Sequence, residues 1–269
     1  MKHTFLKDDE ISMMLGDYYD GKKTIKDCMA KYKVGKSTVM KYLREKGSGG
    51  RKRDEYNNNT YQCDESFFEK MDSHEKAYWF GFITADGNIY NNKLQISLNL
   101  KDEGHLIKFC QRICYNGILY NDNTCKKLMI CRKKIVSDLK NLGLKPNKTL
   151  LIDDTIFDQI PNNFLKSAIL GYIDGDGCFH NNPKGKNTKF SVVGNESFLI
   201  FLQNFFKLYG LKLSEPKKDK RTKQTFYSNL SLSGNKLDIM IDCLYGEGSQ
   251  DFLERKRNKL NYERQSTSL

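Results

Sequence analysis

The sequence lacks any apolar run long enough to cross a membrane. A transmembrane helix needs about 20 consecutive apolar residues, and no stretch of the 269 residues approaches that length. The first ten residues, MKHTFLKDDE, also lack the apolar segment of a secretory signal peptide. These absences predict a soluble intracellular protein, in the cytoplasm or an organelle matrix, without a membrane partner.

The eight cysteines lack the spacing typical of a zinc site or a disulfide framework. None of them forms a CxxC pair, and Cys110 and Cys114 lie one turn apart in an apolar helical pattern. We interpret the cysteines as buried free thiols. The alternative is zinc held by Cys110, Cys114, Cys125 and Cys131.

Acidic residues are too few to balance the basic ones. The chain has 45 Lys and Arg against 33 Asp and Glu, which gives a formal net charge of +12. Such an excess suits a polyanionic partner such as DNA or RNA. Residues 22–53 hold twelve of the basic side chains, with only Asp27 and Glu45 as acids. The charge therefore predicts a nucleic-acid contact near the N-terminus.

Residues 1–47 predict three short helices. Residues 8–18 and about 24–32 have apolar faces, and Ile25, Met29 and Tyr32 are predicted to point inward. A turn at 34–37 precedes a third helix that Ser37 can cap. This pattern is typical of a helix-turn-helix, and an ordinary three-helix surface module is the alternative. The side chains that a recognition helix would present to the major groove are Lys36, Ser37, Thr38, Lys41 and Arg44.

Residues 48–66 predict a basic linker. They lack apolar periodicity and are rich in Gly, Asn and charge. Arg51 and Arg53 could lie along a minor groove, where the negative potential attracts arginine, or they could belong to a solvated charge run.

The remaining chain contains an internal repeat, divided into residues 67–150 and 151–269. WFGFITADGNIY (79–90) aligns with ILGYIDGDGCFH (169–180) at an offset of 90 residues. Each copy continues as helix, two strands, helix, two strands and helix. The ranges are 73–87, 88–92, 93–100, 102–115, 117–121, 126–131 and 134–142, then 162–177, 178–182, 188–193, 195–209, 211–216, 224–233 and 235–245, followed by a tail. We predict an α+β fold of two pseudo-symmetric αββαββα halves.

Residues 93–100 alternate strictly between apolar and polar side chains, so one face is core and the other is polar. The inward set is Leu94, Ile96, Leu98 and Leu100, and the outward set is Lys93, Gln95, Ser97 and Asn99. The polar face could contact base edges and phosphates in a major groove, or it could simply be solvated. The DNA-contact candidates in the second copy are His180, Lys189, Asn229 and Ser231.

The first helix of each copy carries two small residues one turn apart, which allow two helix backbones to approach closely. They are Gly81 and Ala85 in the first copy, and Gly171 and Gly175 in the second. If these helices pack in parallel, Asp86 and Asp176 emerge side by side at their C-terminal ends. Gly87 and Gly177 are available there for a left-handed turn.

Two carboxylates that close, at the negative ends of two helix dipoles, repel each other unless a cation lies between them. Oxygen ligands suit Mg²⁺, with Mn²⁺ as the alternative, and such a site can generate hydroxide for phosphodiester hydrolysis. Asp86 and Asp176 are therefore the candidate catalytic and metal-binding acids.

WFGFITADG and ILGYIDGDG resemble the two LAGLIDADG motifs of monomeric homing endonucleases, and the approach 75–78 is similar too. The resemblance covers about residues 67–250. It implies that the acid before the final Gly, here Asp86 or Asp176, binds catalytic metal with the help of the Ala85 and Gly175 carbonyls. The first motif departs from the pattern at Thr84, where the second keeps Asp174; this position is not the metal ligand.

The resemblance also implies a basic or polar residue after the fourth strand of each copy, which orders the attacking water or offsets charge. Lys134 and Lys236 lie at similar places, with Lys133 nearby, and Cys131 or Ser233 match equally well. Salt-bridge or phosphate-clamp roles are the alternative for these lysines.

The implied function is site-specific cleavage of a long double-stranded DNA target by a monomeric, metal-dependent endonuclease of a mobile genetic element, leaving short 3′ overhangs. An RNA maturase of the same family and a non-cleaving DNA-binding regulator are the alternatives. Retention of both acids disfavours the regulator but does not exclude the maturase.

Overall fold

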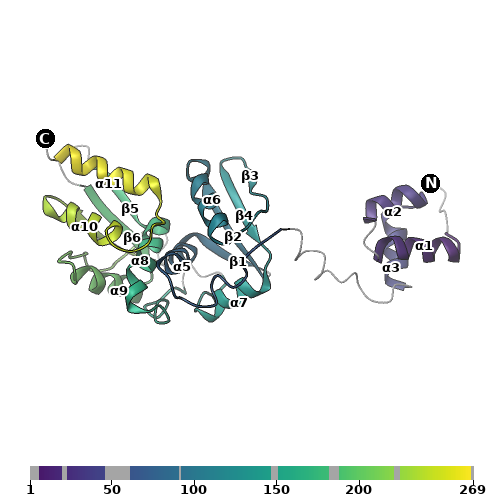
Figure 1. The fold of residues 1–269 in the computed structure, drawn as a ribbon, viewed down its shortest axis with the longest axis horizontal. Coiled ribbons are helices and arrows are strands. Elements are labelled where there is room, and N and C mark those ends of the chain that lie inside the picture. The colour runs from purple at the N-terminus through teal and green to yellow at the C-terminus, as the bar shows by residue number, and fades with distance from the viewer. Residues whose placement is uncertain are drawn as a thin grey trace. The chain divides into compact units, whose positions relative to one another are not determined.

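The computed structural model describes residues 6–19, 23–45, 61–90, 92–146, 151–181, 188–220 and 225–267. The chain forms two compact units, Met1–Thr60 and Tyr61–Leu269 (Figure 1). The predicted linker extended too far, because residues 61–66 pack within the second unit. There the amide of Gln62 donates to Asn116 Oδ1 at 2.7 Å, and the amide of Asp64 donates to the Ile113 carbonyl at 2.7 Å. Arg51 and Arg53 lie outside the described residues.

The first unit contains three helices, α1 (Asp8–Tyr19), α2 (Ile25–Tyr32) and α3 (Lys36–Glu45). Thr24 and Asp27 form a reciprocal capping box that fixes the start of α2. The helices enclose a small core of Leu6, Ile11, Met14, Cys28, Val34, Val39 and Tyr42.

Ile25, Met29 and Tyr32 pack against this core from α2 as predicted, although they are only half-buried, and Cys28 is the fully buried residue of the helix. One detail of this unit differs from the sequence prediction. Ser37 does not cap α3, because α3 begins at Lys36 and the Gly35 carbonyl already accepts the first helical bonds. The turn instead depends on Lys33, whose φ of 55° is left-handed.

The second unit consists of two αββαββα repeats, which confirms the predicted fold class. The first repeat contains α5 (His74–Asp86), β1 (Gly87–Tyr90), β2 (Lys93–Asn99), the short 3₁₀ helix η1 (Leu100–Asp102), α6 (Glu103–Arg112), β3 (Tyr120–Asp122), β4 (Cys125–Ile130) and α7 (Lys133–Asn141). The second contains α8 (Asn162–Asp176), β5 (Cys178–Asn181), β6 (Thr188–Gly194), α9 (Glu196–Lys207), β7 (Lys217–Lys218), β8 (Phe226–Leu232) and α10 (Asn235–Tyr245), followed by α11 (Glu254–Thr267).

Each repeat builds one antiparallel four-stranded sheet with the same strand order, β1-β2-β4-β3 and β5-β6-β8-β7. Helices α6 and α7 pack on the first sheet, and α9 and α10 pack on the second. Helices α5 and α8 lie side by side between the two sheets (Figure 1). One continuous core of buried apolar side chains joins both repeats.

Two predicted details of this unit are wrong, and one element was not predicted. The strand predicted at 211–216 forms at Lys217–Lys218 instead, since Leu211 and Leu213 are buried without a β-ladder. Leu100 is 46% exposed, because β2 ends at Asn99 and the chain turns into η1. The tail forms the helix α11, in which Lys256 and Leu260 are buried, as is Leu253 just before the helix.

The cysteines do not all behave as predicted. Cys28, Cys110 and Cys243 are buried free thiols, but Cys114 and Cys178 are exposed. Within the described ranges, no group of three or more His, Cys, Asp or Glu side chains is arranged to hold a metal ion, so the four-cysteine zinc set is not assembled. Every described helix is also too short or too polar to span a bilayer.

Candidate active site

Glycine determines how closely α5 and α8 approach each other. A methyl group on Gly81 would lie 1.9 Å from the Ala168 carbonyl oxygen, and one on Gly171 would lie 2.0 Å from the Tyr78 carbonyl oxygen. No side chain fits such distances, so the helices touch backbone to backbone. One turn further along, Gly175 meets Ala85 and Asp86, so the helices run in parallel and end at the same place.

The acids Asp86 and Asp176 are the last residues of α5 and α8. A methyl group on Gly175 would lie 2.3 Å from Ala85 Cβ and 3.5 Å from the carboxyl carbon of Asp86. The Asp86 carboxyl group therefore lies against the backbone of α8, one residue before Asp176. The pKa of buried Tyr172 reflects both acids: burial raises it well above its usual value, and the charge and hydrogen bond of Asp176 and the charge of Asp86 raise it further.

The glycines that follow the acids have a different role from the predicted one. Gly87 has φ −77° and ψ 153°, and Gly177 has φ −72° and ψ 147°, so both are extended rather than left-handed. A methyl group on either would lie 2.6 Å from the carbonyl oxygen of Ile83 or Ile173 in the preceding turn. Glycine is needed there for space, because each helix passes directly into a strand.

The two motifs differ at the position of Thr84 and Asp174, and both residues are buried. Thr84 Oγ1 donates to the Phe80 carbonyl of its own helix at 2.8 Å. Asp174 instead accepts from Tyr78 Oη at 2.8 Å, Tyr245 Oη at 3.2 Å and the Leu253 amide at 2.7 Å. Burial raises the pKa of Asp174 to about 6, although these bonds and Lys256 oppose the shift. Asp174 thus connects α5, α10 and the C-terminal segment.

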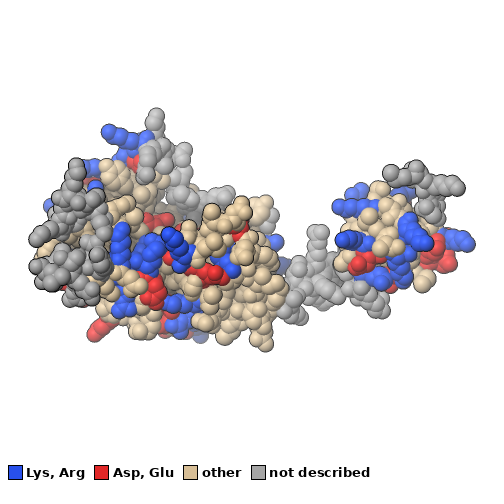
Figure 2. Space-filling view, turned by 90° about the horizontal axis from the view of Figure 1, so that it is seen from above, with Lys and Arg blue, Asp and Glu red and all other residues tan. Residues whose placement is uncertain are grey.

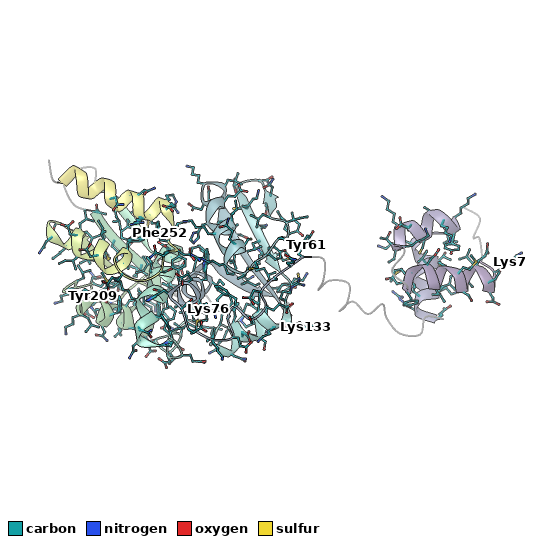
Figure 3. The ribbon with its side chains drawn as sticks, in the orientation of Figure 1. Lys7, Tyr61, Lys76, Lys133, Tyr209 and Phe252 are labelled. Atoms are coloured by element: carbon teal, nitrogen blue, oxygen red, sulfur yellow. The ribbon has the colours of Figure 1, made fainter. Side chains whose placement is uncertain are left out.

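Residues 249–260, which we call the C-terminal strap, cross from one repeat to the other. Asp251 accepts from Trp79 Nε1 at 2.7 Å on α5 and from Arg112 Nε at 2.8 Å on α6. Arg255 Nη2 donates to Asp102 at 3.0 Å. Phe252 lies at the turn before α11, well away from Lys133 at the first residue of α7 (Figure 3).

Lys256, on the strap, lies at the C-terminal end of α8. Its ammonium donates to the carbonyls of Ile173 at 2.8 Å, Asp174 at 2.5 Å and Gly175 at 3.1 Å. Its side chain is almost fully buried. Burial lowers the pKa of Lys256, while the charges of Asp174, Asp86 and Asp176 raise it. A cation is therefore built into the neighbourhood of both acids.

The lysines suggested by the resemblance lie in other surroundings. Lys134 Nζ is 2.9 Å from Glu69 and 3.1 Å from Asp138 in half-exposed ion pairs, which raise the pKa of Lys134. Lys236 is exposed at the second position of α10. The described contacts of these two lysines thus fit surface roles, and they do not connect either of them to the acids.

The DNA-contact candidates of the two repeats all lie on the outer faces of the sheets. Their side chains are exposed or half-exposed on β2, β5, β6 and β8, opposite the faces covered by helices. The register pairs Lys189 with Ser231, and Ser191 with Asn229. The residues are Lys93, Gln95, Ser97, Asn99, His180, Lys189, Asn229 and Ser231.

In the first unit, the other predicted DNA-contact residues lie on the exposed side of α3. Lys36, Ser37, Lys41 and Arg44 are exposed and Thr38 is half-exposed, whereas Val39 and Tyr42 point into the core.

The donor atoms at the ends of α5 and α8 fit a hard divalent cation. The candidate ligands suggested by the sequence are all oxygen atoms: two carboxylates and the carbonyls of Ala85 and Gly175, of which the Gly175 carbonyl also accepts from Lys256 Nζ at 3.1 Å. Mg²⁺ commonly takes one or two carboxylates and completes its shell with water and substrate phosphate. The lack of a side chain on Gly175 leaves the space that the Ala85 methyl group occupies, and this close approach brings the Asp86 carboxyl group to the end of α8.

This architecture has counterparts among solved structures. The structure is similar to LAGLIDADG homing endonucleases. One is the meganuclease I-AabMI bound to uncleaved DNA, which is 11% identical, with 71% of this chain and 90% of that chain covered and a TM-score of 0.49. The full-length DUF199/WhiA protein of Thermotoga maritima is 11% identical, with 77% of this chain and 68% of that chain covered and a TM-score of 0.43.

At the level of sequence, the similarity to known proteins covers a smaller part of the chain. No protein-family model matches the chain. A reverse gyrase of Methanocaldococcus jannaschii is 28% identical over 108 residues, which are 39% of this chain and 6% of that protein. The chain thus spans only a small part of this relative's length.

Sequence reasoning missed Lys256. A signal was present, because Leu253, Lys256 and Leu260 follow a helical spacing of three and four residues in a highly charged segment. A lysine between two leucines on one face indicates a buried stem and a partner for its ammonium.

Proposed function

We propose that the protein is a monomeric, metal-dependent endonuclease that cleaves both strands of a specific DNA duplex. The observation that carries the proposal is the pairing of Asp86 and Asp176 at the ends of two parallel helices in contact. Each acid ends the first helix of one repeat, so each repeat supplies one acid to one strand of a duplex. The motif resemblance at 79–87 and 169–177 supports the same reaction.

Asp86 and Asp176, with the carbonyls of Ala85 and Gly175, would hold the divalent cations, Mg²⁺ or Mn²⁺. Bound there, the metal would supply a hydroxide nucleophile and stabilise the oxygens of the scissile phosphate. The protein's own contribution is position: the glycine contacts fix the two helix ends, and buried Tyr172 lies beside Asp176 and donates to the Val193 carbonyl at 3.3 Å.

DNA recognition is assigned to the outer faces of the two sheets and to the first unit. Lys93 and Lys189 would contact phosphates, and the amides and hydroxyls beside them would contact base edges. In the first unit, α3 would act as the recognition helix of a helix-turn-helix. The combination implies a long target and explains why the basic excess is concentrated at the N-terminus.

The test of this function is cleavage by variants that keep the shape of the acids. Asp86→Asn and Asp176→Asn should each abolish Mg²⁺-dependent cleavage of a duplex selected from a random library, while binding stays within about threefold. Asp72→Asn, which changes an exposed acid just before α5, is the matched control and should cleave normally. Near wild-type cleavage by either Asn variant would remove the assignment.

The runner-up function is binding of a structured RNA, as in a maturase. The same polar sheet faces could contact a ribose-phosphate backbone. Competition decides between the two: if a folded RNA displaces the selected duplex at lower concentration than unlabelled duplex does, and no cleavage occurs with Mg²⁺ or Mn²⁺, the RNA function holds instead.

A further inference from the structure

Helices α5 and α8 bring negative charge together at their C-terminal ends. Each helix directs its negative end toward the site, and each ends in a carboxylate. The last carbonyls of a helix also lack partners within the helix. Without compensation, the ends of α5 and α8 would repel each other before any metal binds.

Lys256 provides that compensation from outside both helices. An ammonium group has three hydrogens to donate, and Lys256 Nζ has three carbonyl acceptors in the last turn of α8, at 2.8, 2.5 and 3.1 Å. The match of donors and acceptors describes a protonated lysine. Its charge interacts with the buried carboxylate of Asp174 and also with Asp86 and Asp176, the ends of both helices.

The strap holds Lys256 in place through contacts on both sides of it in the sequence. Arg255 binds Asp102 at 3.0 Å, and the amide of Leu253 binds Asp174 at 2.7 Å. Leu253, just before α11, and Leu260, within it, are both buried. The view from above, onto the side of the second unit that carries α11, shows Lys and Arg side chains gathered over its middle, with Asp and Glu beside them (Figure 2).

We propose that Lys256 is a positioning residue of the two-acid site: its ammonium is a built-in counter-charge for Asp86 and Asp176, and it shares the Gly175 carbonyl with the divalent cation that the acids bind. The inference rests on the proposed function, because it needs a metal at these acids. The proposal therefore predicts the direction in which Lys256 changes the affinity for metal. Lys256 keeps the acids together in the metal-free protein, and it weakens metal binding by like-charge repulsion and by occupying one ligand.

The experiment measures Mn²⁺ binding to the full chain without DNA, by electron paramagnetic resonance of the free ion at pH 7.5. Lys256→Met removes the charge and should tighten Mn²⁺ binding about three- to tenfold. Lys256→Arg keeps the charge and should stay within about twofold of the wild type. Lys259→Met is the matched control: Lys259 also donates to a carbonyl, that of Phe179 on β5, from the same helix, and its loss should leave the affinity unchanged.

A purely structural role for Lys256 predicts a different result. Lys256→Met would then lower the melting temperature, and its folded fraction would bind Mn²⁺ no more tightly than the wild type, which overturns the proposal. If the Met variant does not fold, the wild-type protein provides the test: bound Mn²⁺ should broaden the nuclear magnetic resonance signal of Lys256 Cε before that of Lys259, and the opposite order overturns it.

The variants of Asp86 and Asp176 distinguish a failure of the proposed role of Lys256 from a failure of the proposed metal site. If Asp86→Asn and Asp176→Asn weaken Mn²⁺ binding but Lys256→Met has no effect, the metal site stands and the role of Lys256 is wrong. If the acid variants bind Mn²⁺ as the wild type does, the metal site fails, and the role of Lys256 fails with it.

Discussion

Among the glycines of α8, Gly171 has the closest neighbour. Its replacement by alanine would place a methyl group 2.0 Å from the Tyr78 carbonyl oxygen and 2.7 Å from the Phe82 amide nitrogen. Both neighbours are backbone atoms of a buried helix and cannot move independently, so Gly171→Ala should destabilise the second unit by about 3 kcal/mol or more. Urea unfolding measures the change.

Gly104 is the control for this prediction. It lies in the first turn of α6, and a methyl group there would meet nothing within 4 Å. Gly104→Ala should therefore stabilise the protein by about 0.5–1 kcal/mol, because alanine has the higher helix propensity. Equal effects of the two substitutions would mean that α5 and α8 are not in backbone contact.

His105 predicts a pH dependence of stability. Burial, and then the charges of Lys108 and Lys256, lower its pKa from 6.5 to about 3. In the unfolded chain this histidine binds a proton below about pH 6.5, whereas in the folded chain it stays neutral until about pH 3. The folded state therefore loses up to about 1.4 kcal/mol per pH unit as the pH falls through this window.

The variant His105→Gln isolates this contribution. Its free energy of unfolding, relative to the wild type, should rise by about 2 kcal/mol between pH 7 and pH 5. Chemical denaturation at the two pH values gives the comparison. Parallel profiles for the two proteins would show that His105 titrates normally.

Among the elements, the C-terminal strap joins the two repeats through side chains that contribute unequally to stability. Asp251 is buried and accepts from the buried indole of Trp79 and from Arg112. Asp251→Ala leaves the indole N–H without an acceptor and should destabilise the protein by about 2–4 kcal/mol. Glu254 is exposed and pairs only with Lys108 among its described contacts, so Glu254→Ala should change stability by less than about 1 kcal/mol. Thermal unfolding of both variants tests the difference.

The elements also show how far a sequence predicts this structure. The repeat at 79–90 and 169–180 predicted all but one of the strands and the order of the elements, because both copies carry the same periodicity. It could not predict α11, which has no counterpart in the first copy and whose charged sequence resembles a solvated tail.

At the site, the paired acids were predictable because small residues recur one turn apart. The extended conformation of Gly87 and Gly177 was not, since glycine permits both an open turn and a close contact. Only the position of the Ile83 and Ile173 carbonyls shows that these glycines are needed for close contact and not for a left-handed turn. The local pattern around Lys256 indicates a buried, partnered lysine, but it cannot identify α8 as the partner, because Gly175 lies 81 residues away in the sequence.

For the whole molecule, the division at residue 60 predicts that binding and cleavage are separable. A chain starting at Tyr61 keeps the complete second unit and its core. It should cleave at saturating concentration, yet bind DNA about 10²- to 10⁴-fold more weakly than the full chain, because the tethered second binding unit is missing. The dependence of log K on log salt should also flatten by about 0.9 for each phosphate that the first unit neutralises in the full chain. Equal affinity and equal slope for the two chains would contradict a DNA-binding role of the first unit.

The distance between Gly175 and Lys256 along the chain also has a consequence for biosynthesis. The two residues are 81 positions apart, and translation at about 5–20 residues per second separates their appearance by about 4–16 s. During that interval the nascent chain contains both acids and both motif helices, but not the cation that neutralises them or the strap that ties the repeats together. Synthesis therefore supplies Lys256 and the strap last, and a product that terminates before them contains both acids without this cation.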